Sequence, residues 1–340
     1  MSPVLNSAPS IAPDWSESSS LRLRLVDKTR LTDDVAMLKF SSSDGSDLPS
    51  WEPGAHLELH LHSGLRRQYS LCGDLRSRAT YTVCVLRQQD GRGGSVEIHD
   101  RLDVGDEIDS SCPRNHFPLI PAADYVLVAG GIGITPIKAM VGQLHERGAS
   151  WRLIYGGRRL SSMAFAEELR TAYPGRVAVL PEEEHGLLDL RGIVATMTPN
   201  SRLYCCGPAP MLAAATQACA GAGVADRLQL ERFGAADNVR ADADFASNTD
   251  GDSVFDVVLQ QSGVTVTVAA NQSILEAVRA ARPDINSSCE EGYCGSCETR
   301  VLYGKPEHRG SLMTPEEHDR EGTMLVCVGR ARTAKLVLDL

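Results

Sequence analysis

The sequence predicts a multidomain protein made of an antiparallel β-barrel, an α/β domain with a parallel sheet, and a small α+β domain. Three observations predict this architecture. Residues 21–118 contain short β-rich segments separated by turn-forming residues. From residue 122 to 233, apolar runs alternate with helix-like segments, as in a parallel sheet with crossover helices. Residues 253–340 return to strands around one short helix, which we expect Ser273 to cap.

Composition marks the ends of these domains. Residues 1–20 hold seven Ser and three Pro but no Lys or Arg, so we expect a disordered tail and not a secretory signal. Residues 234–252 contain five Asp and almost nothing to bury, which predicts a linker. We therefore predict a barrel over 21–121, an α/β domain over 122–233 and an α+β domain over 253–340.

Charge and cysteine content limit the function classes. The chain has 34 basic and 44 acidic residues, a net charge of −10, which argues against nucleic acid as a partner. No apolar stretch reaches the ~20 residues that a membrane span needs. Ten cysteines without a secretory signal predict a reducing, cytoplasmic setting, where clustered thiols serve metal or redox chemistry more often than disulfides.

Three cysteines lie within nine positions near the C-terminus. Cys289, Cys294 and Cys297 have the spacing C-x4-C-x2-C, and Cys327 follows 30 positions later. A disulfide knot, a zinc site and an iron–sulfur cluster are the candidates. Zinc sites usually take ligands as two short pairs, whereas three ligands from one loop and one from elsewhere match a plant-type [2Fe–2S] cluster. Small residues between the cysteines would let the loop wrap around such a cluster.

A glycine-rich turn follows the first strand of the α/β domain. In "VAGGIGITP", Gly130, Gly131 and Gly133 open a helix for which we expect Thr135 as N-cap and Pro136 as first residue. This arrangement predicts a pyrophosphate site at a helix N-terminus. The turn departs from the G-x-G-x-x-G fingerprint, because Pro136 occupies the position of the third glycine.

Two further strand ends in this domain carry candidate ligand-binding residues. Arg158 and Arg159 stand where an acidic residue would bind a ribose hydroxyl. An arginine there could favour a 2′-phosphate or stack on adenine. Cys206, Gly207 and Pro208 form a turn at another strand end, where ligands bind in open α/β sheets. Cys206 could equally be a buried structural thiol.

The barrel carries two weaker motifs. Arg67 and Tyr69 share one face of a strand that ends at Ser70. The guanidinium could neutralise a phosphate and the ring could stack on an isoalloxazine, although an ordinary strand would look the same. A glycine-rich turn, residues 91–95, could cradle a phosphate or be a plain loop.

Alternation in "AHLELHLH" places His56, His60 and His62 on one strand face with Glu58. Three histidines beside a carboxylate would suit a metal ion. We favour a solvated face of the sheet instead, because such alternation is typical of half-exposed strands.

Four of these motifs, in their order along the chain, resemble those of the phthalate dioxygenase reductase family, which includes the vanillate O-demethylase reductases. They are Arg67-x-Tyr69-Ser70, the glycine-rich turn at residues 130–136, the turn Cys206-Gly207-Pro208 and the C-terminal C-x4-C-x2-C with its later cysteine. The resemblance spans nearly all of residues 21–340. It implies a ferredoxin reductase-like barrel that binds FMN, a nicotinamide-binding domain and a β-grasp ferredoxin domain of plant type. The electron relay that it implies requires no catalytic acid or base.

The resemblance also assigns site residues. It implies that FMN is contacted by Arg67, Tyr69, Ser70, Leu71, Val85, Gly93, Gly94, Ser95 and Phe233. It implies that the nicotinamide nucleotide is contacted by Gly130, Gly131, Gly133, Thr135, Pro136, Arg158, Cys206, Gly207 and Pro208. The cluster ligands are Cys289, Cys294, Cys297 and Cys327.

The expected function is that of an NADH-dependent reductase, with NADPH as a possible substitute. Hydride would pass from NADH to FMN, and single electrons through [2Fe–2S] to a Rieske non-haem iron oxygenase of the aromatic ring dioxygenase or O-demethylase type, which acts on an aromatic or similarly small substrate. This direction of electron transfer would be favourable, because plant-type clusters have reduction potentials near about −400 mV and Rieske clusters have potentials of roughly −150 to +300 mV. Alternatives are a cytochrome P450 or another acceptor, a redox-sensing interaction protein, and a zinc-stabilised binding module. We expect a monomer.

Overall fold

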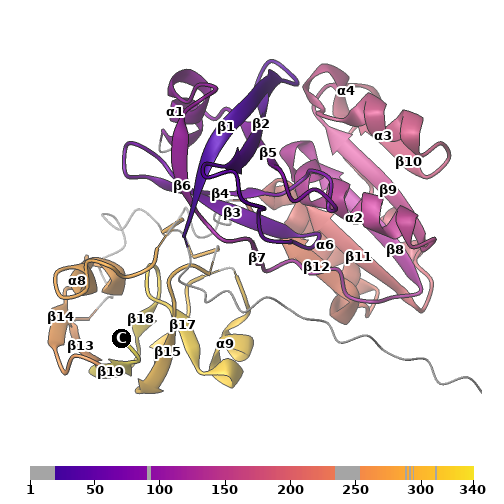
Figure 1. Ribbon diagram of the computed structural model, residues 1–340. Coiled ribbons are helices and arrows are strands. Elements are labelled where there is room, and N and C mark those ends of the chain that lie inside the picture. The colour runs from indigo at the N-terminus through magenta and orange to yellow at the C-terminus, as the bar shows by residue number, and fades with distance from the viewer. Residues whose placement is uncertain are drawn as a thin grey trace, which may run out of the picture.

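The structure is a computed structural model, and it describes residues 20–89, 93–233, 253–287, 289–290, 292–293, 295–310 and 312–340. The predicted linker lies outside these residues, as does the predicted tail apart from Ser20, which begins the first strand. The described chain forms a seven-stranded, two five-stranded and one two-stranded sheet (Figure 1). The predicted combination of a barrel, a parallel sheet and a small α+β unit is confirmed.

The seven-stranded sheet is antiparallel, in the order β4-β3-β6-β1-β2-β5, with β7 beside β3. A single bridge between Leu71 and Val83 joins the end of β4 to β5, so the two outer strands meet and the sheet closes in part. Its interior is filled by fully buried residues such as Leu57, Leu59 and Val85. The strands are β1 (Ser20–Arg30), β2 (Val35–Ser42), β3 (Ala55–His60), β4 (Arg66–Ser70), β5 (Tyr81–Leu86), β6 (Glu107–Ser111) and β7 (Arg114–Asn115).

The barrel also contains a helix, α1 (Gly94–Arg101), where the sequence predicts only strands and turns. The segment "VEIHDRL" alternates in polarity over its first four residues, which favours a strand. However, Ile98 and Leu102 are four residues apart and both are buried in the barrel core. The helical spacing of these two apolar residues therefore decides the structure of this segment.

The second sheet is parallel throughout, in the order β10-β9-β8-β11-β12. In β8, Leu127 and Ala129 pack into one core cluster, whereas Val126 and Val128 pack into another on the opposite face. Helices cover both faces, which explains the continuous apolar run. The elements are β8 (Asp124–Gly130), η1 (Gly131–Gly133), α2 (Ile134–Glu146), β9 (Ser150–Gly157), η2 (Leu160–Ser162), α3 (Ala166–Ala172), β10 (Val177–Pro181), α4 (Glu182–His185), α5 (Leu190–Ala195), β11 (Ser201–Cys206), α6 (Ala209–Gly221), η3 (Ala225–Arg227) and β12 (Leu228–Glu231).

The C-terminal unit is a mixed sheet in the order β14-β13-β19-β15-β17, with a short pair β16-β18. Ser273 caps α8 in a reciprocal capping box with Glu276, as predicted. Helix α9 was not predicted, although Thr314 and Glu317 form the same signature. The elements are β13 (Phe255–Leu259), β14 (Thr265–Val268), α8 (Ile274–Arg279), β15 (Glu298–Tyr303), β16 (Pro306–Glu307), α9 (Pro315–Glu321), β17 (Thr323–Leu325), β18 (Arg330–Ala331) and β19 (Lys335–Leu338).

The barrel touches both other units (Figure 1). Ser70 at the end of β4 contacts Glu231 at the end of β12, and Gln68 in β4 contacts Ser296 in the C-terminal unit. None of the helices in the described residues has the length and apolar character needed to cross a membrane.

Candidate functional site

Three side chains from three strand ends meet where the barrel joins the parallel sheet. The Ser70 hydroxyl donates a hydrogen bond to Glu231 Oε2 at 3.5 Å, and the Cys206 thiol contacts the same oxygen at 3.8 Å. Cys206 and Glu231 are partners in the register of β11 and β12, which places both at the carboxyl edge of the sheet. That edge is where ligands bind in open α/β sheets.

Burial controls the charge of this cluster. It raises the pKa of the Glu231 carboxyl to about 8, and it also raises the pKa of the Cys206 thiol well above its ordinary value. Both groups are therefore protonated and neutral at pH 7. Cys206 is a neutral thiol and Glu231 can hold a proton at the junction, so the cluster can position a ligand and donate hydrogen bonds to it.

Glu231 is absent from the predicted site. Only Phe233, two positions further along the chain, is predicted there. The signal that could have found Glu231 is an acidic residue at the last position of a parallel strand, on the sheet edge where ligands bind.

The glycine-rich turn forms the floor beside this cluster. Gly131 has a φ of 55°, a conformation that glycine adopts without strain, and a Cβ there would meet no atom within 4 Å. A Cβ on Gly133 would lie 2.2 Å from the Cys206 carbonyl oxygen, so only glycine allows β11 to approach this closely. A Cβ on Gly130 would meet Pro208 and Met211 at 2.8 Å. The predicted pyrophosphate turn therefore has the compact backbone that such a site needs.

The predicted N-cap of this helix is wrong. Helix α2 begins at Ile134 with Gly133 as N-cap, because the one-turn helix η1 leads directly into it. Thr135 and Pro136 consequently lie inside the first turn and are buried. The Thr135 hydroxyl donates to the Ile132 carbonyl at 3.0 Å, so it braces the turn from within.

The remaining predicted nucleotide residues surround the same edge. Arg158 is exposed at the end of β9, and Arg159 pairs with Glu183 at 3.8 Å. Gly207 is half-buried and Pro208, the N-cap of α6, is exposed.

Arg67 provides a second feature that points to a ligand. Its Nη1 donates to the Arg66 carbonyl at 2.7 Å, but its Nη2 is buried without a hydrogen-bond partner among the described residues. A Cβ on Gly94 would lie 2.8 Å from Arg67 Cγ and Nε, so the guanidinium stem packs against the first residue of α1. An unsatisfied guanidinium at a helix N-terminus fits an anionic group such as a phosphate.

The other predicted flavin residues of the barrel differ in burial and in their contacts. Tyr69 packs against the barrel core, and burial raises the pKa of its hydroxyl. Leu71 and Val85 are fully buried core residues, so their side chains fill the barrel. The Ser95 hydroxyl bonds to the backbone of Gln88, with the Gln88 N–H donating to it at 3.0 Å.

The turn predicted at residues 91–95 is described only in part. Gly93 adopts a φ of 86° and is the N-cap of α1, whereas Gly91 and Arg92 lie outside the described residues. Phe233, at the end of the described parallel-sheet unit, is 39 % exposed and available for stacking.

Three of the four predicted cluster ligands converge in the C-terminal unit. Cys289, Cys297 and Cys327 are each at most 4 % exposed, and the Cys327 thiol hydrogen-bonds with both of the others. These three alone are not arranged as a single-ion site, and Cys294 lies outside the described residues. A buried set of converging thiols, with a fourth in the same loop, suits a [2Fe–2S] cluster.

Backbone conformation and one arginine shape the first half of this loop. Gly292 has a φ of 75°, and Glu290 has a φ of 55°, which is unusual for a residue with a side chain. Arg279 of α8 holds Glu290 in an ion pair and donates to the Ser287 hydroxyl at 2.8 Å. The loop around Cys289 is therefore supported from the neighbouring helix.

The predicted solvated face of β3 is wrong. His56 and Glu58 are 5 % and 3 % exposed, because β6, β7 and the loop at residue 296 cover them. His62, beyond the strand, is exposed. These histidines do not join Glu58 in a group of three or more side chains that could hold a metal ion, nor does any other set of described His, Cys, Asp and Glu residues.

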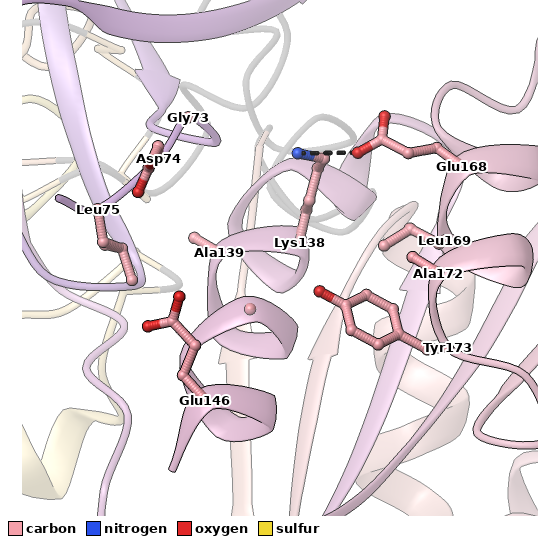
Figure 2. Close-up of a pocket in the computed structure, with 11 residues that line it drawn as sticks. Gly73, Asp74, Leu75, Lys138, Ala139, Glu146, Glu168, Leu169, Ala172 and Tyr173 are labelled. Atoms are coloured by element: carbon pink, nitrogen blue, oxygen red, sulfur yellow. Dashed lines mark ion pairs between the residues drawn. The ribbon is translucent and has the colours of Figure 1, made fainter. Parts of the chain in front are cut away.

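A small cavity of about 130 Å³ also lies between the barrel and the helices of the parallel-sheet unit (Figure 2). It lies between the loop at Asp74 and helices α2 and α3, and the ion pair of Lys138 with Glu168 at 3.3 Å crosses one side of it. None of its lining residues belongs to the predicted flavin or nucleotide sites. The cavity is also smaller than typical ligand pockets of ~300–1,000 Å³.

Comparisons with known proteins agree with this arrangement. Residues 127–217 match the model "Oxidoreductase NAD-binding domain", and residues 257–332 match "2Fe-2S iron-sulfur cluster binding domain". The chain is 36 % identical to phthalate dioxygenase reductase from Burkholderia cepacia over 330 residues, which cover 95 % of this chain and 98 % of that protein. The chain belongs to the phthalate dioxygenase reductase family. The structure of a phthalate dioxygenase reductase covers 95 % of this chain and 99 % of that one, with a TM-score of 0.70 and 36 % identity.

A solved type IV self-sufficient cytochrome P450 monooxygenase is also similar, with 38 % identity and a TM-score of 0.82. The match covers 94 % of this chain but 41 % of that one, so this chain corresponds to part of the larger protein. Several further relatives are named as reductase subunits of monooxygenase systems.

As a member of this family, the protein is an oxidoreductase and a reductase component of an oxygenase system, with an NAD-binding domain and a [2Fe–2S] domain. The predicted family, fold class and enzyme class are therefore confirmed.

Glu231→Gln tests the charge state of the junction. Between its ordinary pKa of 4.5 and its raised pKa of about 8, Glu231 binds a proton in the folded protein that it does not bind when unfolded. Its contribution to the free energy of unfolding therefore falls as the pH rises through this window. The glutamine variant cannot ionise and should escape this loss.

The measurement is the melting temperature of both proteins at pH 5 and pH 9. We expect the variant to gain about 2–4 °C or more on the wild type between these pH values. An unchanged difference in melting temperature would show that Glu231 does not carry a raised pKa.

Proposed function

We propose that this protein transfers electrons from NADH through bound FMN and its [2Fe–2S] cluster to a Rieske-type terminal oxygenase. One observation carries the proposal. Strand β4, which holds the predicted flavin residues Arg67 and Tyr69, contacts the parallel-sheet unit through Ser70 and the cysteine loop through Gln68, at 3.5 and 2.8 Å. A flavin held at this strand would therefore be adjacent to both the parallel-sheet unit and the cysteine loop.

FMN supplies the conversion that the pathway needs, because it accepts two electrons together as hydride and releases them one at a time. The chain's own residues would hold the groups in place. The Arg67 guanidinium and the N-terminus of α1 would bind the phosphate of FMN. The turn at Gly131 would receive the pyrophosphate of NADH. Cys206 and Glu231 would lie beside the nicotinamide, and because both side chains are neutral they would place no negative charge next to it.

A substitution in the phosphate site tests the choice of FMN. Gly94→Ala would place a Cβ 2.8 Å from the Arg67 side chain and displace it. We expect the dissociation constant of FMN, measured by fluorescence titration of the apoprotein, to rise about tenfold to hundredfold, as for loss of a charged hydrogen bond.

Arg101→Ala is the matched control, because Arg101 is an exposed arginine at the other end of the same helix. It should leave FMN affinity unchanged. Equal affinities of Gly94→Ala and wild type would remove Arg67 from the phosphate site.

The choice of a Rieske partner rests on potential and on family. A plant-type cluster near about −400 mV can reduce a Rieske cluster at roughly −150 to +300 mV. A haem monooxygenase is a second candidate, favoured by the similarity to part of a self-sufficient cytochrome P450. We propose that the reductase itself is a monomer, since one chain carries all three sites.

Parallel partner assays separate the two acceptors. The reduced protein is mixed with a purified Rieske oxygenase or with a cytochrome P450, and oxidation of NADH or NADPH is followed with and without the substrate of that oxygenase. Substrate-coupled oxidation of NADH with the Rieske protein is the expected result. Coupled turnover with the P450 alone would overturn the Rieske assignment, and a preference for NADPH would overturn the choice of NADH.

A further inference from the structure

The cysteine loop is fastened to the barrel through one serine. Ser296, next to Cys297, accepts a hydrogen bond from Gln68 Nε2 at 2.8 Å and donates one to Glu58 Oε2 at 3.1 Å. A hydroxyl can donate one hydrogen bond and can also accept one. Here both of these bonds are made with side chains of the barrel. Both bonds join residues more than 220 positions apart in the chain.

Glu58 and Gln68 are held by the barrel in positions that suit the contact with Ser296. Glu58 and Gln68 lie directly opposite each other in the pairing of β3 with β4, so their side chains share one face of the sheet. Glu58 is 3 % exposed. Its Oε1 contacts His60 Nε2 at 3.3 Å and Arg66 Nη1 at 3.8 Å, which directs Oε2 to Ser296. A buried carboxylate held in this way is a well-positioned acceptor.

A close backbone approach supports the same contact. Gly295 has a φ of 77°, and a Cβ there would lie 3.1 Å from both His116 of the barrel and Leu312 of the C-terminal unit. Glycine is therefore needed at this position for the loop to reach the barrel. His116 in turn packs edge-to-face on His56 of β3, with ring centroids 5.3 Å apart.

This contact bears on electron transfer because of the strand that makes it. Alternate residues of β4 point to opposite faces, so Gln68 faces the cysteine loop while Arg67 and Tyr69 face the proposed flavin site. One strand thus separates the two cofactor sites. A change in the position of the cysteine loop relative to β4 would change the distance between flavin and cluster, and the rate of electron transfer falls steeply with that distance.

We propose that Glu58, Gln68 and Ser296 form a docking clamp that positions the cluster for electron transfer from the flavin. They are positioning residues, since none of them is a cluster ligand. The inference rests on the proposed function for the direction of electron flow. The clamp as a structural contact does not depend on that function.

The test uses Gln68→Ala, Ser296→Ala and the double variant, as holoproteins. Under anaerobic stopped-flow mixing with NADH, the flavin and cluster absorbance bands are followed separately. We expect the rate of cluster bleaching, relative to the rate of flavin bleaching, to fall about threefold to tenfold in Gln68→Ala, as for loss of one hydrogen bond. Ser296→Ala removes both bonds and should lower this ratio at least as far. The double variant should fall no further than about the larger single effect, because both substitutions remove the same bond.

A second readout needs no turnover. Hydrogen–deuterium exchange of the oxidised protein, without NADH, is measured over residues 295–303. We expect faster exchange in the clamp variants. Gln261→Ala is the matched control, because Gln261 makes a comparable surface bond, to Asp339 at 3.3 Å, within the C-terminal unit. It should match the wild type in both readouts.

The clamp is overturned if either the rate ratio or the exchange of the double variant equals that of the wild type. Failure of NADH to bleach the wild-type flavin would instead overturn the proposed function. The exchange measurement would still decide whether the clamp exists.

Discussion

Replacing Cys327 with Ser should abolish the [2Fe–2S] cluster while leaving NADH-dependent flavin reduction intact. Cys327 comes from a different segment of the chain than the cysteine loop, and its thiol closes the set formed with Cys289 and Cys297. Serine is a poor substitute for a thiolate ligand of iron. We expect near-complete loss of the cluster absorbance and of the electron paramagnetic resonance signal after reduction, and loss of electron delivery to any oxygenase.

The bleaching of the flavin by NADH should persist in this variant, because no residue of the junction at Ser70, Cys206 and Glu231 contacts Cys327. Cys112→Ser is the control, since Cys112 is a half-buried thiol in the barrel and is not one of the predicted cluster ligands. It should retain both absorbance bands. A Cys327→Ser protein that keeps a normal cluster spectrum would show that Cys327 is not a ligand.

The second large effect is expected from Gly133→Ala. The added Cβ would lie 2.2 Å from the Cys206 carbonyl oxygen and 2.8 Å from the Gly207 amide nitrogen. Neither backbone atom can rotate away, so β11 and the turn must separate. A misplacement near 1 Å can lower a rate about hundredfold. We expect the rate constant of flavin reduction by NADH to fall by about this factor, with a cost in stability of roughly 1–3 kcal/mol.

Gly142→Ala provides a control within the same helix. A Cβ at Gly142 meets no atom within 4 Å, so alanine should stabilise α2 by up to ~1 kcal/mol through its helix propensity. Flavin reduction should not change. The packing account of the nucleotide turn is contradicted if Gly133→Ala reduces its flavin at the wild-type rate.

Features encoded over short stretches of sequence were predictable. The cysteine spacing, the glycine-rich turn and the Ser273 cap are each defined within about ten residues, and the structure contains the turn, the cap and three converging cysteines. The helical period of α1 was hidden because polar and apolar residues also alternate there. The predicted N-cap, Thr135, lies two positions after the observed one, Gly133, because the one-turn helix η1 leads directly into α2.

Features that depend on contacts between distant segments were not predictable in the same way. Glu231 meets Ser70 across 161 positions of sequence, and its place at a strand end does not by itself reveal that contact. Glu58 was assigned to a solvated face because its strand alternates. Its burial comes from Ser296, which is 238 positions away, and from the strands beside β3. Alternating polarity shows which side chains of a strand share one face. Whether that face is exposed depends on how other parts of the chain pack against it.

The most direct test of the proposed electron path is an anaerobic titration of the purified protein with NADH, followed by visible absorbance. We predict that the flavin and [2Fe–2S] bands both bleach, the flavin by accepting hydride and the cluster by receiving electrons through β4. Bleaching of the flavin alone would contradict the path from flavin to cluster. Bleaching of neither band by NADH would contradict its assignment as the electron donor.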